Sequence, residues 1–205
     1  MSDASSAIAS ERRRAAAIAG HAGDEATARS LLSDSDPSVR ATAFAALARC
    51  GELDASTLLS ALGDVDATVR RRGATLAAAS RADEVNARLR AMLRDADHLV
   101  AETAAWALGE WSGDAANAVD ELASMATDHT EPLCREAAVA ALGAIGDDRG
   151  LSAVLRACAD KPAVRRRAVL ALAPFDGPDV EAAIDAALND RDWQVRQAAE
   201  DLRRP

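Results

Sequence analysis

Apolar and polar residues follow the period of an α-helix along this chain. In DPSVRATAFAAL (36–47) and KPAVRRRAVLAL (161–172), apolar residues recur three and four positions apart, which places them on one helical face. Most of these positions hold alanine, which has the highest helix propensity and lets helices pack closely. Breakers such as CGE and PFDGPD separate the helical segments, and no alternating strand pattern intervenes. The sequence therefore predicts an all-α fold.

A short skeleton, x-x-V-R-x-x-A, recurs along the chain and marks a repeat. Acidic residues stand two to six positions before its valine, where a short carboxylate can cap the backbone N–H groups that begin a helix. Spacings of 30, 31, 34, 30 and 31 residues separate the positions Val39, Val69, Val100, Cys134, Val164 and Val195.

Each repeat divides into two helices, the first about ten residues long and the second beginning near the acidic turn. Because one pair cannot bury its apolar face alone, neighbouring pairs must stack into an α/α superhelix, that is, a single solenoid domain over 1–205. We expect an N-terminal cap over 1–23, with a helix at 8–19, and six repeats at about 24–52, 53–82, 83–113, 114–147, 148–177 and 178–205.

The arginine after the valine recurs at the repeat period, as a structural residue would. We expect its guanidinium to bond the acidic turn of the next repeat, and only the third repeat, with Ala101, lacks it. This arginine ladder comprises Arg40, Arg70, Arg135, Arg165 and Arg196.

Charge and cysteine content limit the function. A net charge of −9 opposes binding to nucleic acid or to anionic lipid. No segment has the length of a membrane span or a signal peptide, so we expect a cytoplasmic protein. Cys50, Cys134 and Cys158 lack the spacing of a zinc site or a disulfide framework, and we expect them to pack in the core.

TEPLCREAAVAALGAIGDD (130–148) and DHLVAETAAWALGEW (97–111) resemble the HEAT repeat of the phycobilin-lyase-like class, and the resemblance extends over about residues 24–203. It implies a HEAT-like solenoid, a fold that also occurs in bilin lyases, deoxyhypusine hydroxylase and DNA-glycosylase-like proteins. The His-Glu pairs that hold iron in the hydroxylase are absent from the sequence, and five aromatic residues in an acidic chain do not favour a DNA-binding groove. Bilin lyases stay open as an alternative.

In solenoids of this class the second helices line the concave surface. At 100° per residue, positions 0, +4, +8 and +11 from the valine form the core arc, which includes Trp111, and positions −2, −1, +2, +3, +6 and +10 lie opposite. Trp106 and Trp193 should therefore face the groove, as interaction hot spots or as cover for alanine-rich gaps. The partner-binding candidates are Ala67, Thr68, Arg71, Arg72, Thr75, His98, Glu102, Thr103, Trp106, Glu110, Leu133, Glu136, Ala140, Arg166, Arg167, Leu170, Trp193, Gln194, Gln197 and Asp201.

The sequence also bears on two other kinds of site, a metal site and an enzyme active site. DADH (95–98) and DHTE (128–131) place carboxylates and a histidine at successive turns, as either a divalent metal site or helix caps. Nothing pairs a nucleophile with a base at a motif spacing, so we expect no enzyme and no cofactor. The sequence favours a monomeric scaffold that binds a protein partner in its groove, and a bilin-handling protein is the alternative.

Overall fold

The computed structural model describes residues 2–111 and 115–204, with the backbone alone for residues 2–5. These residues form thirteen α-helices and two short 3-10 helices, with no strand among them. The prediction of an all-α fold is confirmed. In chain order the helices comprise one N-terminal helix followed by six helix pairs, as the repeat count predicts. The chain forms two compact units, Met1–Leu89 and Arg90–Pro205, and each is described by itself.

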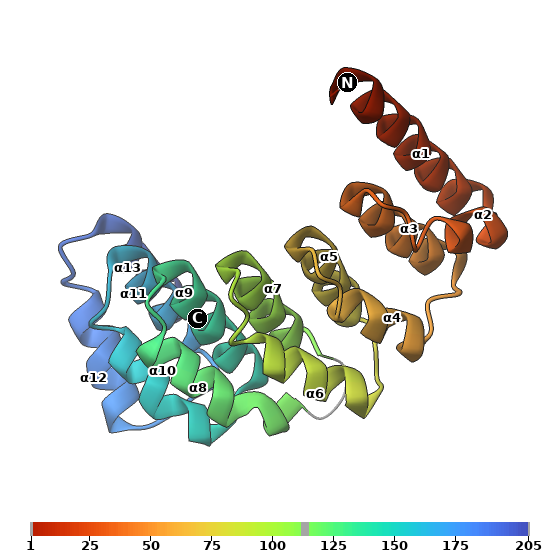
Figure 1. Cartoon of the computed structure of the whole chain (residues 1–205). Helices are drawn as coiled ribbons and strands as arrows, with labels where there is room; N and C mark the ends of the chain where they lie inside the picture. The colour runs from red at the N-terminus through yellow and green to blue at the C-terminus, as the bar shows by residue number, and fades with distance from the viewer. Residues whose placement is uncertain (1, 112–114, 205) are drawn as a thin grey trace. The chain divides into compact units, whose positions relative to one another are not determined.

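The first unit is a two-layer stack (Figure 1). Its long N-terminal helix packs directly against the second helix of the first pair, the position of an N-terminal cap, and is longer than the predicted 8–19. One layer contains α1 (Ser2–Ala22), α3 (Pro37–Cys50) and α5 (Ala67–Ala77), and the other contains α2 (Glu25–Ser30) and α4 (Ala55–Leu62). Helix α6 (Asp83–Met92) follows and crosses the boundary between the units.

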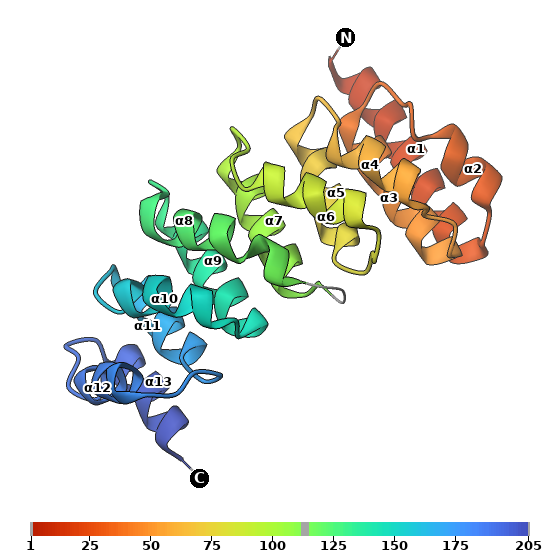
Figure 2. The ribbon, with the colours of Figure 1, turned by 90° about the horizontal axis from the view of Figure 1, so that it is seen from below.

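The second unit repeats this arrangement, and its helix pairs follow one another along the stack (Figures 1 and 2). Each second helix packs on the next: α7 (His98–Gly109) on α9 (Pro132–Ile145), α9 on α11 (Pro162–Ala171), and α11 on α13 (Trp193–Arg203). The first helices form the other layer: α8 (Val119–Asp128), α10 (Leu151–Ala157) and α12 (Pro178–Ala187), with the 3-10 turns η1 (Ala115–Ala118) and η2 (Asp148–Gly150) leading into α8 and α10.

Aspartates cap four of the second helices, as their spacing predicts, whereas the N-cap residues of α9 and α11, Glu131 and Lys161, form no side-chain capping bond. The Asp97 carboxylate accepts hydrogen bonds from the backbone N–H groups of Leu99 and Val100, and Asp192 accepts one from Gln194. Asp36 and Asp66 cap α3 and α5 in the same way. Each carboxylate satisfies amide groups that a helix start leaves without an intrahelical acceptor.

Small residues bring the second helices unusually close together. A Cβ placed on Gly109 would lie 2.8 Å from the Cα of Ala141, and one on Gly143 would lie 2.6 Å from the Cα of Ala171. Glycine is therefore required at both crossings, α7 on α9 and α9 on α11, because an added methyl group would overlap the facing backbone. The crossings fix the spacing of the helices that carry the candidate binding face.

Candidate binding face

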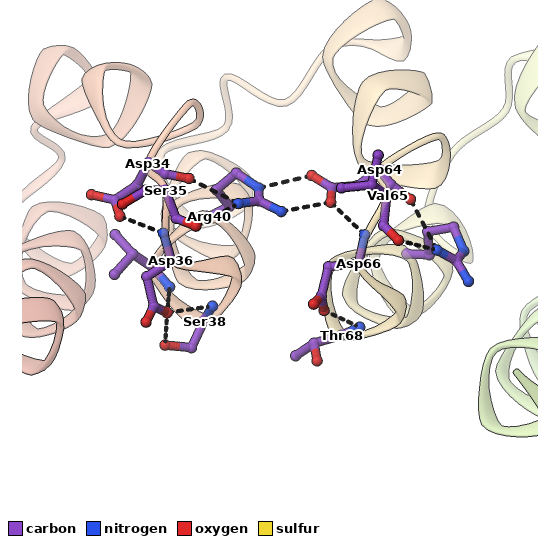
Figure 3. A network of polar contacts seen from close by, with 11 residues as sticks. Asp34, Ser35, Asp36, Ser38, Arg40, Asp64, Val65, Asp66 and Thr68 are labelled. Atoms are coloured by element: carbon purple, nitrogen blue, oxygen red, sulfur yellow. Dashed lines mark hydrogen bonds and ion pairs between the residues drawn. The ribbon is translucent and has the colours of Figure 1, made fainter. Parts of the chain in front are cut away.

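The arginine ladder joins consecutive repeats through paired hydrogen bonds. In the first unit, Arg40 donates to the Asp64 carboxylate from Nε at 2.9 Å and from Nη2 at 2.7 Å (Figure 3). Its Nη1 donates at 2.8 Å to the backbone carbonyl of Asp34 in its own turn. One guanidinium thus holds two successive turns.

The same geometry recurs in the second unit. Arg135 binds Asp160 through Nε and Nη2, at 2.6 and 2.7 Å, and Arg165 binds Asp190 at 2.9 and 2.8 Å. Hydrogen bonding to Arg135 lowers the pKa of Asp160 below its ordinary value, and Arg165 does the same for Asp190. These contacts confirm the predicted bonding to the next turn. Arg196, in the last repeat, donates to the Asp190 carbonyl at 2.7 Å.

The ladder contains one more arginine, which precedes Arg40, the first that the repeat count identifies. Arg12 on α1 donates to Asp34 from Nε at 2.6 Å and from Nη2 at 2.9 Å, which is the Arg40–Asp64 geometry. We missed this contact because Glu11 stands where the repeat has valine. The signal was present in RRRAA (12–16), which aligns with RRRGA (70–74).

The ladder is interrupted in the second unit, where both partners are replaced. Ala101 stands at the arginine position, and His129 stands at the aspartate position of the following turn. His129 keeps the turn hydrogen bond of that aspartate, since its Nδ1 accepts the N–H of Glu131 at 3.1 Å, just as Asp190 accepts that of Asp192 at 2.8 Å. Arginine and aspartate have been exchanged together, so neither charge is left without its partner.

The two histidine-containing turns differ: Asp97 caps α7, whereas Glu131 at the start of α9 forms no side-chain capping bond. The side chains of Asp97 and His129 each accept a hydrogen bond from a backbone N–H group, that of Leu99 and that of Glu131 respectively. Within residues 6–111 and 115–204, whose side chains are described, no group of three or more histidine, cysteine or carboxylate side chains is close enough to hold a metal ion. The capping interpretation is confirmed for DADH, whereas in DHTE the histidine rather than a carboxylate stabilises the turn.

The three tryptophans separate as their positions predict. Trp111 is 7% exposed and packs in the core, whereas Trp106 is 43% exposed and Trp193 is 65% exposed. Both exposed indoles lie on second helices, α7 and α13. Their exposure is confirmed, and their role in binding stays a prediction.

Trp106 lies over a hollow of about 180 Å³ between α7 and α9. Alanines of α9 form much of its floor, and Leu133, 44% exposed, stands at one side. Three carboxylates and one guanidinium line it. These charged residues are Glu102, Glu110, Glu136 and Arg167, all of them predicted.

A second hollow, of about 230 Å³, surrounds Trp193 between α11 and α13. Arg166 and Leu170 come from α11, and Gln194, Gln197 and Asp201 come from α13. Arg166 and Arg167 also approach Glu136 on α9, with Nη2 to Oε1 distances of 3.7 and 3.6 Å. The structure therefore gathers most of the predicted residues on the second-helix face of one unit, formed by α7, α9, α11 and α13.

Several of the predicted residues line neither hollow: on α5 these are Ala67, Thr68, Arg71, Arg72 and Thr75, and on α7 they are His98 and Thr103. Arg71 and Arg72 are exposed on α5, in the first unit, and His98 is exposed at the start of α7. The expectation for Thr103 was wrong. This residue is buried, and its hydroxyl donates to the carbonyl of Leu99 at 2.7 Å, which satisfies the polar group within the helix. A helix packed within a layered stack exposes a narrower arc than the sequence pattern suggests.

The prediction that the cysteines pack in the core is only partly confirmed. Cys134 is fully buried, whereas Cys50 and Cys158 are half-buried. Burial raises the pKa values of the Cys134 and Cys158 thiols to about 11. Both therefore stay protonated near neutral pH, where a thiol is a poor nucleophile.

Comparison with protein families identifies HEAT repeats over residues 55–143 and 85–163. These matches together extend over residues 55–163, more than half of the chain. No curated protein matches the sequence significantly. Among the described residues, no helix is both long enough and apolar enough to cross a membrane.

Solved structures with the same fold include engineered and natural proteins. An engineered protein has a TM-score of 0.62 and 22% identity, over 86% of this chain and 94% of its own. YibA of Escherichia coli has a TM-score of 0.64 and 21% identity, over 82% of this chain and 66% of its own. A designed armadillo repeat protein, in complex with the peptide (KR)4, has a TM-score of 0.64 and 19% identity, over 87% of this chain and 97% of its own. At these identities the likeness shows a shared fold.

Proposed function

Because the chain belongs to the family of HEAT repeat proteins, we propose that it is a non-enzymatic scaffold that binds an extended segment of a partner protein. We place the segment on the second-helix face of the unit Arg90–Pro205. We also assign the repeats to the phycobilin-lyase-like class, on the V-R-x-x-A skeleton. Repeat arrays characteristically present such continuous surfaces to partners.

The observation that carries this proposal is the pair of exposed indoles, each over its own hollow on the same face. Exposed tryptophans in hollows are frequent anchors of protein interfaces. Three helix-to-helix steps of roughly 10 Å separate α7 from α13, so the indoles lie about 30 Å apart. An extended segment of about ten residues covers that distance at roughly 3.3 Å per residue. The similar designed armadillo repeat protein in complex with the peptide (KR)4 supports this proposal.

The chemistry of the hollows supports a bilin ligand less well. Each hollow holds roughly 200 Å³, whereas cofactor and ligand pockets usually occupy about 300–1,000 Å³. Bilins carry propionate carboxylates, which Glu102 and Glu110 beside Trp106 would repel. We therefore expect that the protein, mixed with biliverdin and then separated from free pigment by gel filtration, retains no visible absorbance.

A peptide-display selection tests the scaffold. A random library of twelve-residue peptides is selected against the full chain and counter-selected against the variant Trp106→Ala/Trp193→Ala. We expect enriched peptides that each tryptophan change weakens by about tenfold or more. Trp111→Phe, a conservative core change, serves as the control and should leave affinity unchanged. Failure to enrich any peptide that depends on the two exposed tryptophans would contradict the proposal.

A further inference from the structure

We propose that the hollow between α7 and α9 is a recognition site for one arginine side chain of the bound segment. Its guanidinium would stack on the Trp106 indole, with the carboxylates of Glu102 and Glu110 at its two ends. This inference rests on the proposed function, and it names the chemistry that the partner segment must carry.

The spacing of Glu102 and Trp106 on α7, and of Glu110 at its C-cap, produces this arrangement. Glu102 lies four residues before Trp106 and Glu110 lies four residues after it. Residues four apart occupy the same face of an α-helix, one turn above the other. The indole is therefore flanked along the helix axis by one carboxylate on each side, and all three groups line the same hollow.

The local charge balance leaves these two carboxylates without a cation. Glu136, the third carboxylate of the hollow, is approached by both Arg166 and Arg167. In the part of the chain that the structure describes, neither Glu102 nor Glu110 forms an ion pair. The negative field reaches into the helix interface, because Glu102 contributes to the raised pKa of Cys134 after the larger effect of burial. A cation entering the hollow would meet uncompensated negative charge.

The remaining lining selects arginine among cations. Alanines of α9 and the exposed Leu133 offer an apolar surface to the methylene groups of the side chain. A guanidinium is planar, weakly hydrated and able to stack on an indole while its N–H groups bind carboxylates. An ammonium would make the ion pair but not the stacking interaction.

The hollow around Trp193 provides a contrast within the same molecule. Its carboxylate, Asp201, accepts a hydrogen bond from Gln197 at 3.0 Å and pairs with Arg204 at 3.3 Å. Arg166 adds a positive charge to the lining. Trp193 is thus an exposed indole without uncompensated carboxylates, and we expect no preference for a cation there.

An NMR titration of the full-length protein tests the inference. The three indole N–H resonances, assigned with Trp→Phe variants, are followed while N-acetyl-arginine methylamide or its neutral isostere N-acetyl-citrulline methylamide is added. We expect the Trp106 resonance to move with the arginine compound, which should bind about tenfold more tightly than the citrulline compound. The Trp193 and Trp111 resonances should show no such preference.

Two further measurements separate charge recognition from a general loss of structure. Glu102→Gln/Glu110→Gln should abolish the preference for arginine, and so should about 1 M salt with the unaltered protein, where the Debye length falls to roughly 3 Å. Equal binding of the two compounds, or a preference that survives both treatments, would overturn the inference. Peptides that require the tryptophans but bind equally well with citrulline in place of arginine would leave the scaffold standing and remove only the arginine site. An arginine-dependent shift of the Trp106 resonance without any enriched peptide would support the arginine site and contradict the proposed scaffold.

Discussion

Arg135 and Asp160 belong to consecutive repeats and meet through two parallel hydrogen bonds, with their side chains only 13% and 19% exposed. Arg135 also donates to the carbonyl of His129 at 2.7 Å, so one side chain bridges two turns. Bidentate charge-assisted bonds of this kind are stronger than neutral ones and restrict orientation. The ladder therefore fixes the register of one repeat on the next.

Removing this arginine should destabilise the protein. We expect Arg135→Ala to reduce the free energy of unfolding by about 2 kcal/mol, because Asp160 would remain partly buried without its partner. Arg196→Ala is the matched control, since Arg196 binds a backbone carbonyl and forms no ion pair with a carboxylate among the described residues. Urea denaturation of both variants measures the difference. Equal stability losses would show that the carboxylate contact adds nothing.

The contribution of the ladder should depend on pH with a definite sign. The pKa values of Asp160 and Asp190 are lowered by their arginine partners, relative to about 3.9 in the unfolded chain. The stabilisation is therefore complete above about pH 4 and is lost as the pH falls through the lowered folded-state values. Thermal melts of the parent and Arg135→Ala should differ at pH 7 and converge toward pH 2. A constant difference would refute the linkage.

The interruption at Ala101 and His129 makes a reciprocal exchange possible. Ala101→Arg alone should cost about 2 kcal/mol, because it buries a cation without an acidic partner. Adding His129→Asp should recover at least about 1 kcal/mol, since it restores the pair found at Arg165 and Asp190. A double-mutant cycle by chemical denaturation measures this coupling. Additive effects would mean that the two replacements are unrelated.

The close crossings of the second helices should tolerate no methyl group. We expect Gly143→Ala to lower stability by about 1–3 kcal/mol, although alanine favours the helix, because the new Cβ would overlap Ala171. At Gly63 an added Cβ would have its nearest contact at 3.4 Å, with φ at −103°. Gly63→Ala should therefore change stability by less than about 0.5 kcal/mol. Calorimetry of the two variants provides the comparison, and similar melting temperatures would contradict it.

The three tryptophans should contribute differently to the free energy of unfolding. Trp111→Ala should cost about 3–5 kcal/mol through the cavity it leaves, whereas Trp106→Ala and Trp193→Ala should cost less than about 1 kcal/mol. Denaturation midpoints of the three variants test this expectation. If all three lost stability equally, the exposed indoles would be packing residues rather than anchors.

Much of this architecture could be predicted because the repeat presents the same constraint several times. The V-R spacing located the helix pairs and most of the ladder, and helical angles separated Trp111 from Trp106 and Trp193. Arg12 was missed because its contact depends on tertiary packing of a helix that lacks the repeat valine. The burial of Thr103 could not be read from angles alone, because how much of a helix its neighbours cover depends on their spacing.

The exchange of Arg and Asp for Ala101 and His129 means that the joints between repeats respond differently to their surroundings. Added salt weakens the contacts between repeats that contain an arginine–aspartate ion pair. These ion pairs are formed by Arg12, Arg40, Arg135 and Arg165. The contact of α7 with α9 has no such ion pair among the described residues and depends on apolar packing, which weakens on cooling instead. In the first-helix layer of the same two repeats, Arg90 of α6 pairs with Glu121 of α8, so added salt weakens this joint on that side. Beneath Trp106, in the second-helix layer, its stiffness follows temperature instead.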